Sequence, residues 1–173
     1  MRYPSETTST AYISVGSNLG DRLRNCCDGV SALCADDAVR LVARSPFYET
    51  EPVDYLDQGW FLNAALKVQT TLAPEALLDR LQAVQHARGR TAAGVRFGPR
   101  TLDLDIIFYD HLVLQTPRLI LPHPRMHKRR FVLQPICDID GSVMHPTLGR
   151  TVASILNQLV EEGQTLRPCS FDC

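Results

Sequence analysis

The chain has 173 residues, of which 45% are hydrophobic and 21% are charged, and its formal net charge at pH 7 is −1. This is the composition of an ordinary globular protein, so it excludes a chain that is mainly disordered. No basic excess indicates a nucleic-acid partner, and no apolar run approaches the roughly 18 residues that span a bilayer. We expect one domain at residues 11–165, between a flexible arm at 1–10 and a tail at 166–173, with no membrane or nucleic-acid partner.

The pattern of the first 70 residues predicts three strands and one helix. The predicted strands are residues 11–16, 38–49 and 60–70, and the predicted helix is residues 21–35. The helix carries apolar residues at helical spacing and follows Ser17 and Asn18, either of which can cap it. Residues 38–49 alternate apolar with polar, which is typical of a single half-buried strand. The stretch 50–59 contains proline, glycine and acidic residues and predicts a loop.

The second half of the chain completes a mixed α+β pattern. A helix that begins at Pro74 is expected to end at Gly89, and a loop follows at 89–99. The remaining predicted elements are a strand at 101–110, a hairpin strand at 111–115, and helices within 122–139 and 151–163. The order β-α-β-β-α-β predicts a ferredoxin-like α+β fold. We expect an antiparallel sheet with helices on one face and extra C-terminal helices.

The cysteines are expected to lie in a reducing compartment. Residues 1–10 lack the apolar core of a secretory signal, which predicts a cytoplasmic location, where thiols stay reduced. Cys26, Cys27 and Cys34 lie in one predicted helix, where thiols pack as small apolar side chains. Cys173 is predicted to be exposed and oxidisable, with no functional role.

The stretch RFGPRTLDLDII at residues 96–107 carries the clearest chemistry. Asp103 and Asp105 are two residues apart, so on a strand they share one face, with Cα atoms about 7 Å apart. Mg²⁺ favours one or two protein carboxylates together with water and phosphate oxygens. Arg100 and three arginines of the preceding loop supply the positive charge that a polyphosphate needs. On this pattern alone a metal and phosphate site competes with a second interpretation, the solvated face of a half-buried strand.

Four segments resemble the 6-hydroxymethyl-7,8-dihydropterin pyrophosphokinase family. They are AYISVGSNLGD (11–21), FLNAAL (61–66), RFGPRTLDLDII (96–107) and LPHPRMHKRRFVLQPICDI (121–139). Their order and spacing match the family over residues 11–139, and the third segment is highly specific to it. The resemblance implies an enzyme of folate biosynthesis that transfers pyrophosphate from ATP to the hydroxymethyl group of 6-hydroxymethyl-7,8-dihydropterin and releases AMP. It also implies two Mg²⁺ ions bound with ATP.

The resemblance further implies roles for individual residues. The catalytic residues are Arg90, Arg100, Asp103 and Asp105, of which the two aspartates are the metal ligands. The ATP contacts are Gln82, Arg90, Arg100, Ile106, His123 and Arg129. The pterin contacts are Thr50, Val53, Phe61, Asn63 and Phe131. Asp103 is in addition a candidate acceptor for the proton of the hydroxymethyl group.

The residue types at the implied pterin site suit that ligand. Phe61 and Phe131 can sandwich a flat bicyclic ring, although aromatic residues at these positions also fit a core. Asn63 offers both donors and acceptors to the polar edge of a pterin, and a strand interior disfavours Asn without such a reason. His123, between two prolines, also fits an ordinary turn. The chain has no GxxxxGK[ST] segment, so it is not a P-loop kinase.

Four positions depart from a common pattern of the family: Phe97 replaces a frequent Trp, Gln85 an acidic ATP contact, Glu51 a proline and Pro124 a Tyr. None removes a charge from the metal site, so they bear on ATP affinity and loop kinetics rather than on the reaction class.

Two other kinds of protein stay open as alternatives. One is another magnesium-dependent nucleotide phosphotransferase, which would form ADP where pyrophosphoryl transfer forms AMP. The other is an RNA-binding module without catalysis, which the sheet class permits. The near-neutral charge and the lack of an aromatic RNP motif argue against RNA. We expect a monomer that acts on two small molecules.

Overall fold

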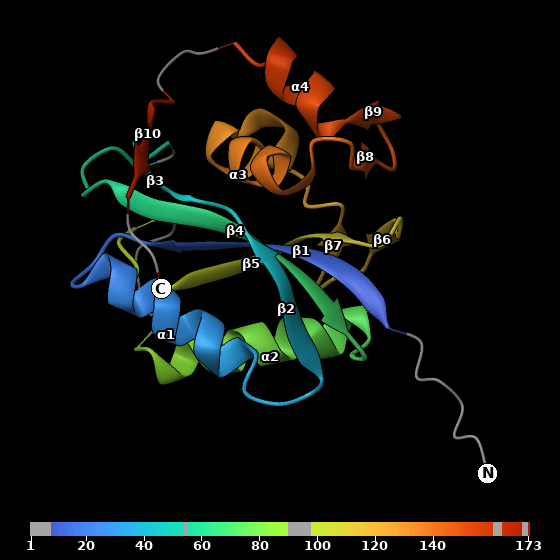
Figure 1. Ribbon diagram of the computed structural model, residues 1–173, viewed down its shortest axis with the longest axis horizontal. Coiled ribbons are helices and arrows are strands. Elements are labelled where there is room, and N and C mark those ends of the chain that lie inside the picture. Colours follow the sequence, from blue (N-terminus) through green and yellow to red (C-terminus); the bar gives the residue numbers. More distant parts are fainter. Residues whose placement is uncertain (1–7, 54, 90–97, 161–163, 171–172) are drawn as a thin grey trace.

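A computed structural model describes residues 8–53, 55–89, 98–160, 164–170 and 173 (Figure 1). Its centre is a six-stranded antiparallel sheet in the order β10-β3-β4-β1-β5, with β2 also paired to β4. The strands are β1 (Ser9–Ser17), β2 (Val39–Arg44), β3 (Phe47–Thr50), β4 (Phe61–Thr70), β5 (Asp103–Tyr109) and β10 (Leu166–Cys169). β1 lies between β4 and β5, which is the strand arrangement of a split βαβ unit and confirms the ferredoxin-like prediction.

Helices cover both faces of this sheet (Figure 1). They are α1 (Arg22–Leu33), α2 (Pro74–Ala87), α3 (Arg130–Asp140) and α4 (Val152–Gln158). α1 and α2 pack on one face, where Ile13, Leu66 and Leu104 belong to the larger core cluster. The extra C-terminal helices α3 and α4 pack on the opposite face, against Tyr12 and Phe108. The sheet is therefore the middle layer of three.

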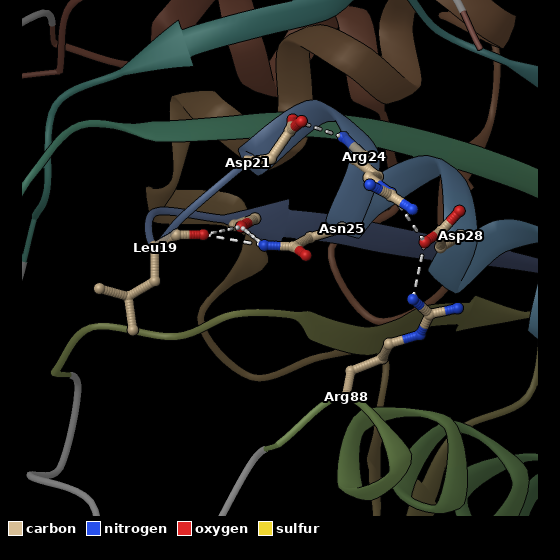
Figure 2. Close-up of polar contacts among 7 residues, drawn as sticks. Leu19, Asp21, Arg24, Asn25, Asp28 and Arg88 are labelled. Carbon is tan, nitrogen blue, oxygen red and sulfur yellow. Dashed lines mark hydrogen bonds and ion pairs between the residues drawn. The ribbon is translucent and has the colours of Figure 1, made fainter.

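Polar contacts fix the start of α1 and join it to α2 (Figure 2). The Asp21 carboxylate accepts a hydrogen bond from the Arg24 amide, so Asp21 is the N-cap, and the prediction of Ser17 or Asn18 is wrong. Asp28 on α1 forms an ion pair of 2.7 Å with Arg88, the residue that ends α2. Gly89 follows at φ 85°, as expected of a glycine that ends a helix.

The predicted single strand at 38–49 is two strands. β2 pairs with the second half of β4 and β3 with its beginning. Between them the Ser45 amide donates to the Ala65 carbonyl and the Ser45 hydroxyl accepts from the Ala65 amide, while Pro46 has no N–H to continue a ladder. The expected burial of alternate residues is also wrong in β2, where Leu41 and Val42 are both exposed, because the register with β4 shifts between Leu41 and Ala43.

Short elements complete the fold. They are the hairpin of β6 (Leu114–Gln115) and β7 (Ile120–Leu121), the 3₁₀ helix η1 (Met126–Lys128), and the hairpin of β8 (Met144–His145) and β9 (Arg150–Thr151). The predicted tail at 166–173 contributes β10, which pairs with β3. The domain therefore extends past residue 165. Among the described residues no helix is both long and apolar enough to cross a membrane.

The expectation of a reduced thiol is wrong for Cys27, whereas Cys173 is exposed and oxidised, in agreement with its prediction as an exposed, oxidisable residue. Cys27 on α1 forms a disulfide with Cys173, across a sequence separation of 146. The C-terminal residue is therefore held beside α1, where Figure 1 marks the C-terminal end. Cys26 and Cys34 remain free thiols, as expected, and burial raises the pKa of Cys26 to about 12. Cys26 therefore behaves as a small apolar side chain.

Candidate active site

One cavity of about 340 Å³ lies at the end of the central strands. It is lined by Ser14, Gly16, Thr50, Glu51, Pro52, Val53, Gln58, Phe61, Asn63, Gly98, Arg100, Asp103, Asp105, Ile107, His123, Pro124, Arg125, Arg129, Phe131 and Val132. Its floor is the face of the sheet that also packs against α3, because Ser14 and Gly16 alternate with Ile13 and Val15 of the opposite core.

Strand register brings the acidic and the amide groups into one row. Gly16 of β1 is opposite Asn63 of β4 on one side and opposite Asp103 of β5 on the other. Asp105 is opposite Ser14, one step further along the same face. Two strand spacings separate Asn63 from Asp103, roughly 10 Å. The cavity thus holds an amide and a carboxylate pair at a distance that suits two ligands placed side by side.

The two aspartates of β5 have the arrangement expected from the sequence. Both are half-buried and line the cavity, while Leu104 and Ile106 between and after them are buried in the opposite core. Arg100 donates to the Asp103 carboxylate at 2.8 Å. Carboxylate oxygens are hard ligands, and two of them on one rigid strand fit Mg²⁺ completed by water and phosphate oxygens. Among the described residues no group of three acidic, His or Cys side chains could hold a metal alone.

Asn63 is held in place by its neighbours. It is buried, and its amide nitrogen donates to the Thr50 hydroxyl at 2.6 Å. The amide oxygen approaches Gly16 so closely that a Cβ on that residue would lie 2.3 Å from it. The hydrogen bond to Thr50 uses one of the two N–H groups of the Asn63 amide. The second N–H and the amide oxygen can therefore bond to a ligand. Gly16 is therefore required for the position of Asn63, a role that the sequence analysis did not assign.

The two aromatic side chains expected at the pterin site line the same cavity from two different elements. Phe61 opens β4, and Phe131 lies in the first turn of α3. The Arg129 guanidinium lies over the Phe131 ring, 5.5 Å from its centre. Val53 lines the cavity from the loop after β3 and is partly exposed. Placing both rings at one cavity is consistent with a sandwich around a flat ligand, and that sandwich stays a prediction.

His123 is a neutral imidazole in this structure. Burial lowers its pKa, with smaller contributions from the nearby charges of Arg129 and Arg125, to about 4. Its Nδ1 accepts a hydrogen bond from the Arg125 amide at 3.1 Å, which places the ring proton on Nε2. His123 therefore presents an uncharged N–H donor near the arginines.

Asn18 is a second site residue that the sequence analysis missed. Its side-chain oxygen accepts a hydrogen bond from the backbone N–H of Arg100 at 2.7 Å, and its backbone N–H donates to the Arg100 carbonyl at 3.0 Å. Its carboxamide nitrogen donates to Gln58 and Gly59. Asn18 thus ties the segment before β5 to the segment before β4. Only the contacts across three separate segments reveal this role, because the sequence pattern predicted Asn18 as a candidate cap of the following helix.

Among the described residues, two predicted site residues do not line the cavity. Gln82 is exposed on α2, and Ile106 is buried in the core on the other face of the sheet. Arg90, like the departing residue Phe97, lies outside the described residues. Gln85, another departure, is buried and binds the Leu104 amide through its side-chain oxygen, so it supports β5 from behind.

Comparison with known proteins agrees with the family resemblance of the four sequence segments. Residues 12–141 match the family model described as 7,8-dihydro-6-hydroxymethylpterin-pyrophosphokinase. A relative named 2-amino-4-hydroxy-6-hydroxymethyldihydropteridine pyrophosphokinase from Bacillus subtilis is 46% identical over 75% of this chain and 77% of its own length. The chain belongs to this pyrophosphokinase family.

Other relatives are longer than this chain. The folic acid synthesis protein fol1 of Pneumocystis carinii is 41% identical over 87% of this chain, which spans only 20% of that protein. The fold is also shared with the wild-type HPPK-DHPS of Plasmodium falciparum, at a TM-score of 0.69 and 13% identity, over 88% of this chain and 42% of the other. This likeness concerns the fold alone.

Proposed function

We propose that this chain transfers the pyrophosphoryl group of ATP to the hydroxymethyl oxygen of 6-hydroxymethyl-7,8-dihydropterin, with release of AMP, as a step in folate biosynthesis. The observation that carries the proposal is the row formed by Asn63, Gly16 and Asp103, which gives one cavity an amide site and a carboxylate site roughly 10 Å apart. Family membership supports the same reaction.

The uncharged side of the cavity suits the pterin. Asn63 and Thr50 present hydrogen-bonding groups on the sheet, and Phe61 and Phe131 border the same space. A pterin that binds its polar edge to Asn63 would satisfy the groups that the bond to Thr50 leaves over. Ligands without that edge would leave a buried amide unpaired, which is a strong basis for specificity.

The charged side suits the triphosphate. Asp103 and Asp105 would hold Mg²⁺, which when bound neutralises phosphate charge and polarises the phosphorus under attack. Arg100 and Arg129 contribute fixed positive charge, and His123 contributes a neutral N–H donor. In the reaction the hydroxymethyl oxygen loses its proton, for which Asp103 is the proposed acceptor, and bonds to the β-phosphorus. The bond from that phosphorus to the oxygen shared with the α-phosphorus breaks, and AMP leaves with that oxygen. Positioning and charge stabilisation are the main demands of such a transfer.

The proposal is tested by product analysis. The purified chain is mixed with ATP, Mg²⁺ and 6-hydroxymethyl-7,8-dihydropterin, and nucleotides are separated by chromatography. We expect AMP in equal amount to the pterin diphosphate, and no AMP when pterin or Mg²⁺ is omitted. ADP as the product would instead assign an ordinary kinase, and no nucleotide turnover would reject the proposal.

We further propose that the chain acts as a monomer in the cytoplasm. A reducing compartment would act on the Cys27–Cys173 disulfide, so the state of this bond reports on the location. Light scattering tests the monomer, and alkylation of thiols before and after cell lysis tests the state of the two cysteines.

A further inference from the structure

Arg125 lies at the cavity but has no role in the family resemblance described above. It lines the same space as Asp103 and Asp105, and it belongs to the segment between β7 and α3 that also carries His123 and Arg129. These three residues therefore approach the cavity from one short stretch of chain.

The backbone of this stretch is well anchored. The Arg125 amide donates to His123 Nδ1, and the Arg125 carbonyl accepts from the Lys128 amide at 3.2 Å. Met126, the next residue, is completely buried in the core cluster beneath α3. The His123 amide is itself bonded to the Ile107 carbonyl of β5 at 3.0 Å. The turn is thus fixed to the strand that carries the aspartates, and the position of Arg125 relative to them is defined by this network.

The charges of the cavity give Arg125 a function. The described lining residues include three arginines, Arg100, Arg125 and Arg129, and three carboxylates, Glu51, Asp103 and Asp105, so positive and negative charges balance among them. Arg100 is paired with Asp103, and Glu51 accepts a hydrogen bond from the Thr165 amide at the outer side. Without Arg125 these described lining residues would carry a net negative charge. A polyphosphate, itself strongly negative, would then be repelled before any metal is counted.

The guanidinium of Arg125 also lies near the His123 ring. Its positive charge is one of the causes, after burial and Arg129, that hold the pKa of His123 low. Two cations and a neutral N–H donor therefore line the cavity from the same short segment. Such a group offers several donors to the oxygens of a single phosphate.

We propose that Arg125 is a nucleotide-binding residue, whose guanidinium donates to a phosphate oxygen of ATP beside His123 and Arg129. The inference rests on the proposed function, because it assigns a ligand group to a residue of the same cavity. It makes the segment from His123 to Arg129 the wall that receives the phosphate chain, opposite the aspartates of β5.

Calorimetric titration with a non-hydrolysable ATP analogue and Mg²⁺ tests the assignment. Arg125→Ala should weaken binding of the analogue about tenfold, the order of one charge-assisted hydrogen bond. Arg125→Lys should recover part of this loss, since it keeps the charge without the planar fork. Adenosine, which has no phosphate, should bind the parent chain and Arg125→Ala equally well.

The matched control is Arg118→Ala. Arg118 is an exposed arginine, paired with Asp79 and Glu75 of α2 and absent from the cavity lining. It should leave analogue binding unchanged. Thermal unfolding of each variant establishes that the fold persists, and Arg125→Gln, which keeps most of the side-chain volume, replaces Arg125→Ala if that variant unfolds.

The outcomes separate this inference from the proposed function. If the parent chain forms AMP and Arg125→Ala binds the analogue as tightly as the parent, the assignment of Arg125 is overturned and the proposed function stands. If Arg125→Ala weakens the analogue but the parent chain forms no AMP, the assignment stands and the proposed reaction fails. Equal losses for adenosine and for the analogue would indicate a structural role and overturn the phosphate assignment.

Discussion

The two sides of the cavity are built in different ways. On the side nearest β3 and β4 the sheet presents uncharged polar groups, Thr50 and Asn63, which are buried and bonded to each other, and Glu51 after β3 is the charged residue there. The side nearest β5 is crowded with charge, with carboxylates and guanidinium groups that are half-buried and come from separate segments. Neighbouring strands position the first side, whereas ion pairs and turns position the second.

This difference separates shape recognition from charge recognition. A buried amide whose position is fixed by Thr50 and Gly16 accepts one pattern of donors and acceptors and penalises others. A balanced set of charges has little preference for shape, but it responds strongly to an incoming anion and its metal ion. Substitutions on the two sides should therefore affect different substrates and different kinetic constants.

The largest effect is expected from Asp105→Asn. The amide keeps the shape of the side chain but removes one of the two carboxylate ligands, so turnover should fall by about 1,000-fold. Steady-state kinetics at saturating Mg²⁺ measures this loss. Asp79→Asn, a matched change on the exposed face of α2, should have no effect on turnover. Near-normal turnover of Asp105→Asn would reject the metal site on β5.

Acid should destabilise the protein through His123. Its folded pKa of about 4 is below the unfolded value of about 6.5, so the unfolded chain takes up a proton first as the pH falls. The free energy of unfolding should then decrease between pH 6.5 and pH 4, by at most about 3 kcal/mol from this group. The surroundings that set its pKa are burial and the charges of Arg129, Arg125 and Asp103.

Denaturant unfolding of the parent and of His123→Gln, at pH 7 and near pH 4, tests this contribution. The difference in stability between the two proteins should shift in favour of the variant at the lower pH. His145, whose pKa is lowered by burial and by His127, titrates on the same side of neutrality and remains in both proteins. An identical pH dependence in parent and variant would show that His123 does not titrate as described.

Arg100→Ala should act on catalysis more than on binding. Arg100 forms an ion pair with Asp103, and its backbone N–H and C=O are both hydrogen-bonded to Asn18. Its charge therefore lies at a defined point beside the proposed metal ligands. We expect kcat to fall about 100-fold with a smaller rise in the KM for ATP, because the charge on the phosphates is redistributed in the transition state. A change in KM alone would mean that Arg100 only holds ATP in the ground state.

Gly16→Ala should weaken pterin binding while leaving the nucleotide unaffected. The added Cβ would meet the Asn63 oxygen and displace the amide, with an expected loss of about tenfold in pterin affinity. Calorimetry with pterin on Gly16→Ala, Asn63→Ala and the double variant tests the mechanism. Once Asn63 is truncated, Gly16→Ala should add little. Fully additive losses would contradict a role that acts through Asn63.

The sequence predicted the parts of the site that depend on local pattern. The alternation of Asp103, Leu104 and Asp105 defines a strand with acidic and apolar faces, and the structure has both. The sequence pattern could not predict contacts between segments that only the complete fold brings together. Asn18 and Gly16 gain their roles from segments far along the chain. The Cys27–Cys173 bond depends on where the chain end returns after β10.

Local patterns also failed where two signals conflicted. The alternation across residues 38–49 indicated one strand, but Pro46 interrupts the ladder, and the pairing with β4 changes on either side of it. Gln85 was recognised as a departure at an ATP contact, and its burial and its bond to Leu104 instead give it a structural role behind β5. The residue type of Gln85 alone does not show that its side chain is hydrogen-bonded to the backbone of β5.

Both substrates are expected to occupy one cavity at the same time, on adjacent sides. Titration of the parent chain with pterin, in the presence and absence of a saturating non-hydrolysable ATP analogue and Mg²⁺, tests this arrangement. We expect the analogue to tighten pterin binding, and linkage requires that the pterin tighten the analogue by the same factor. Competition, in which the analogue weakens or abolishes pterin binding, would contradict two adjacent sites in this cavity.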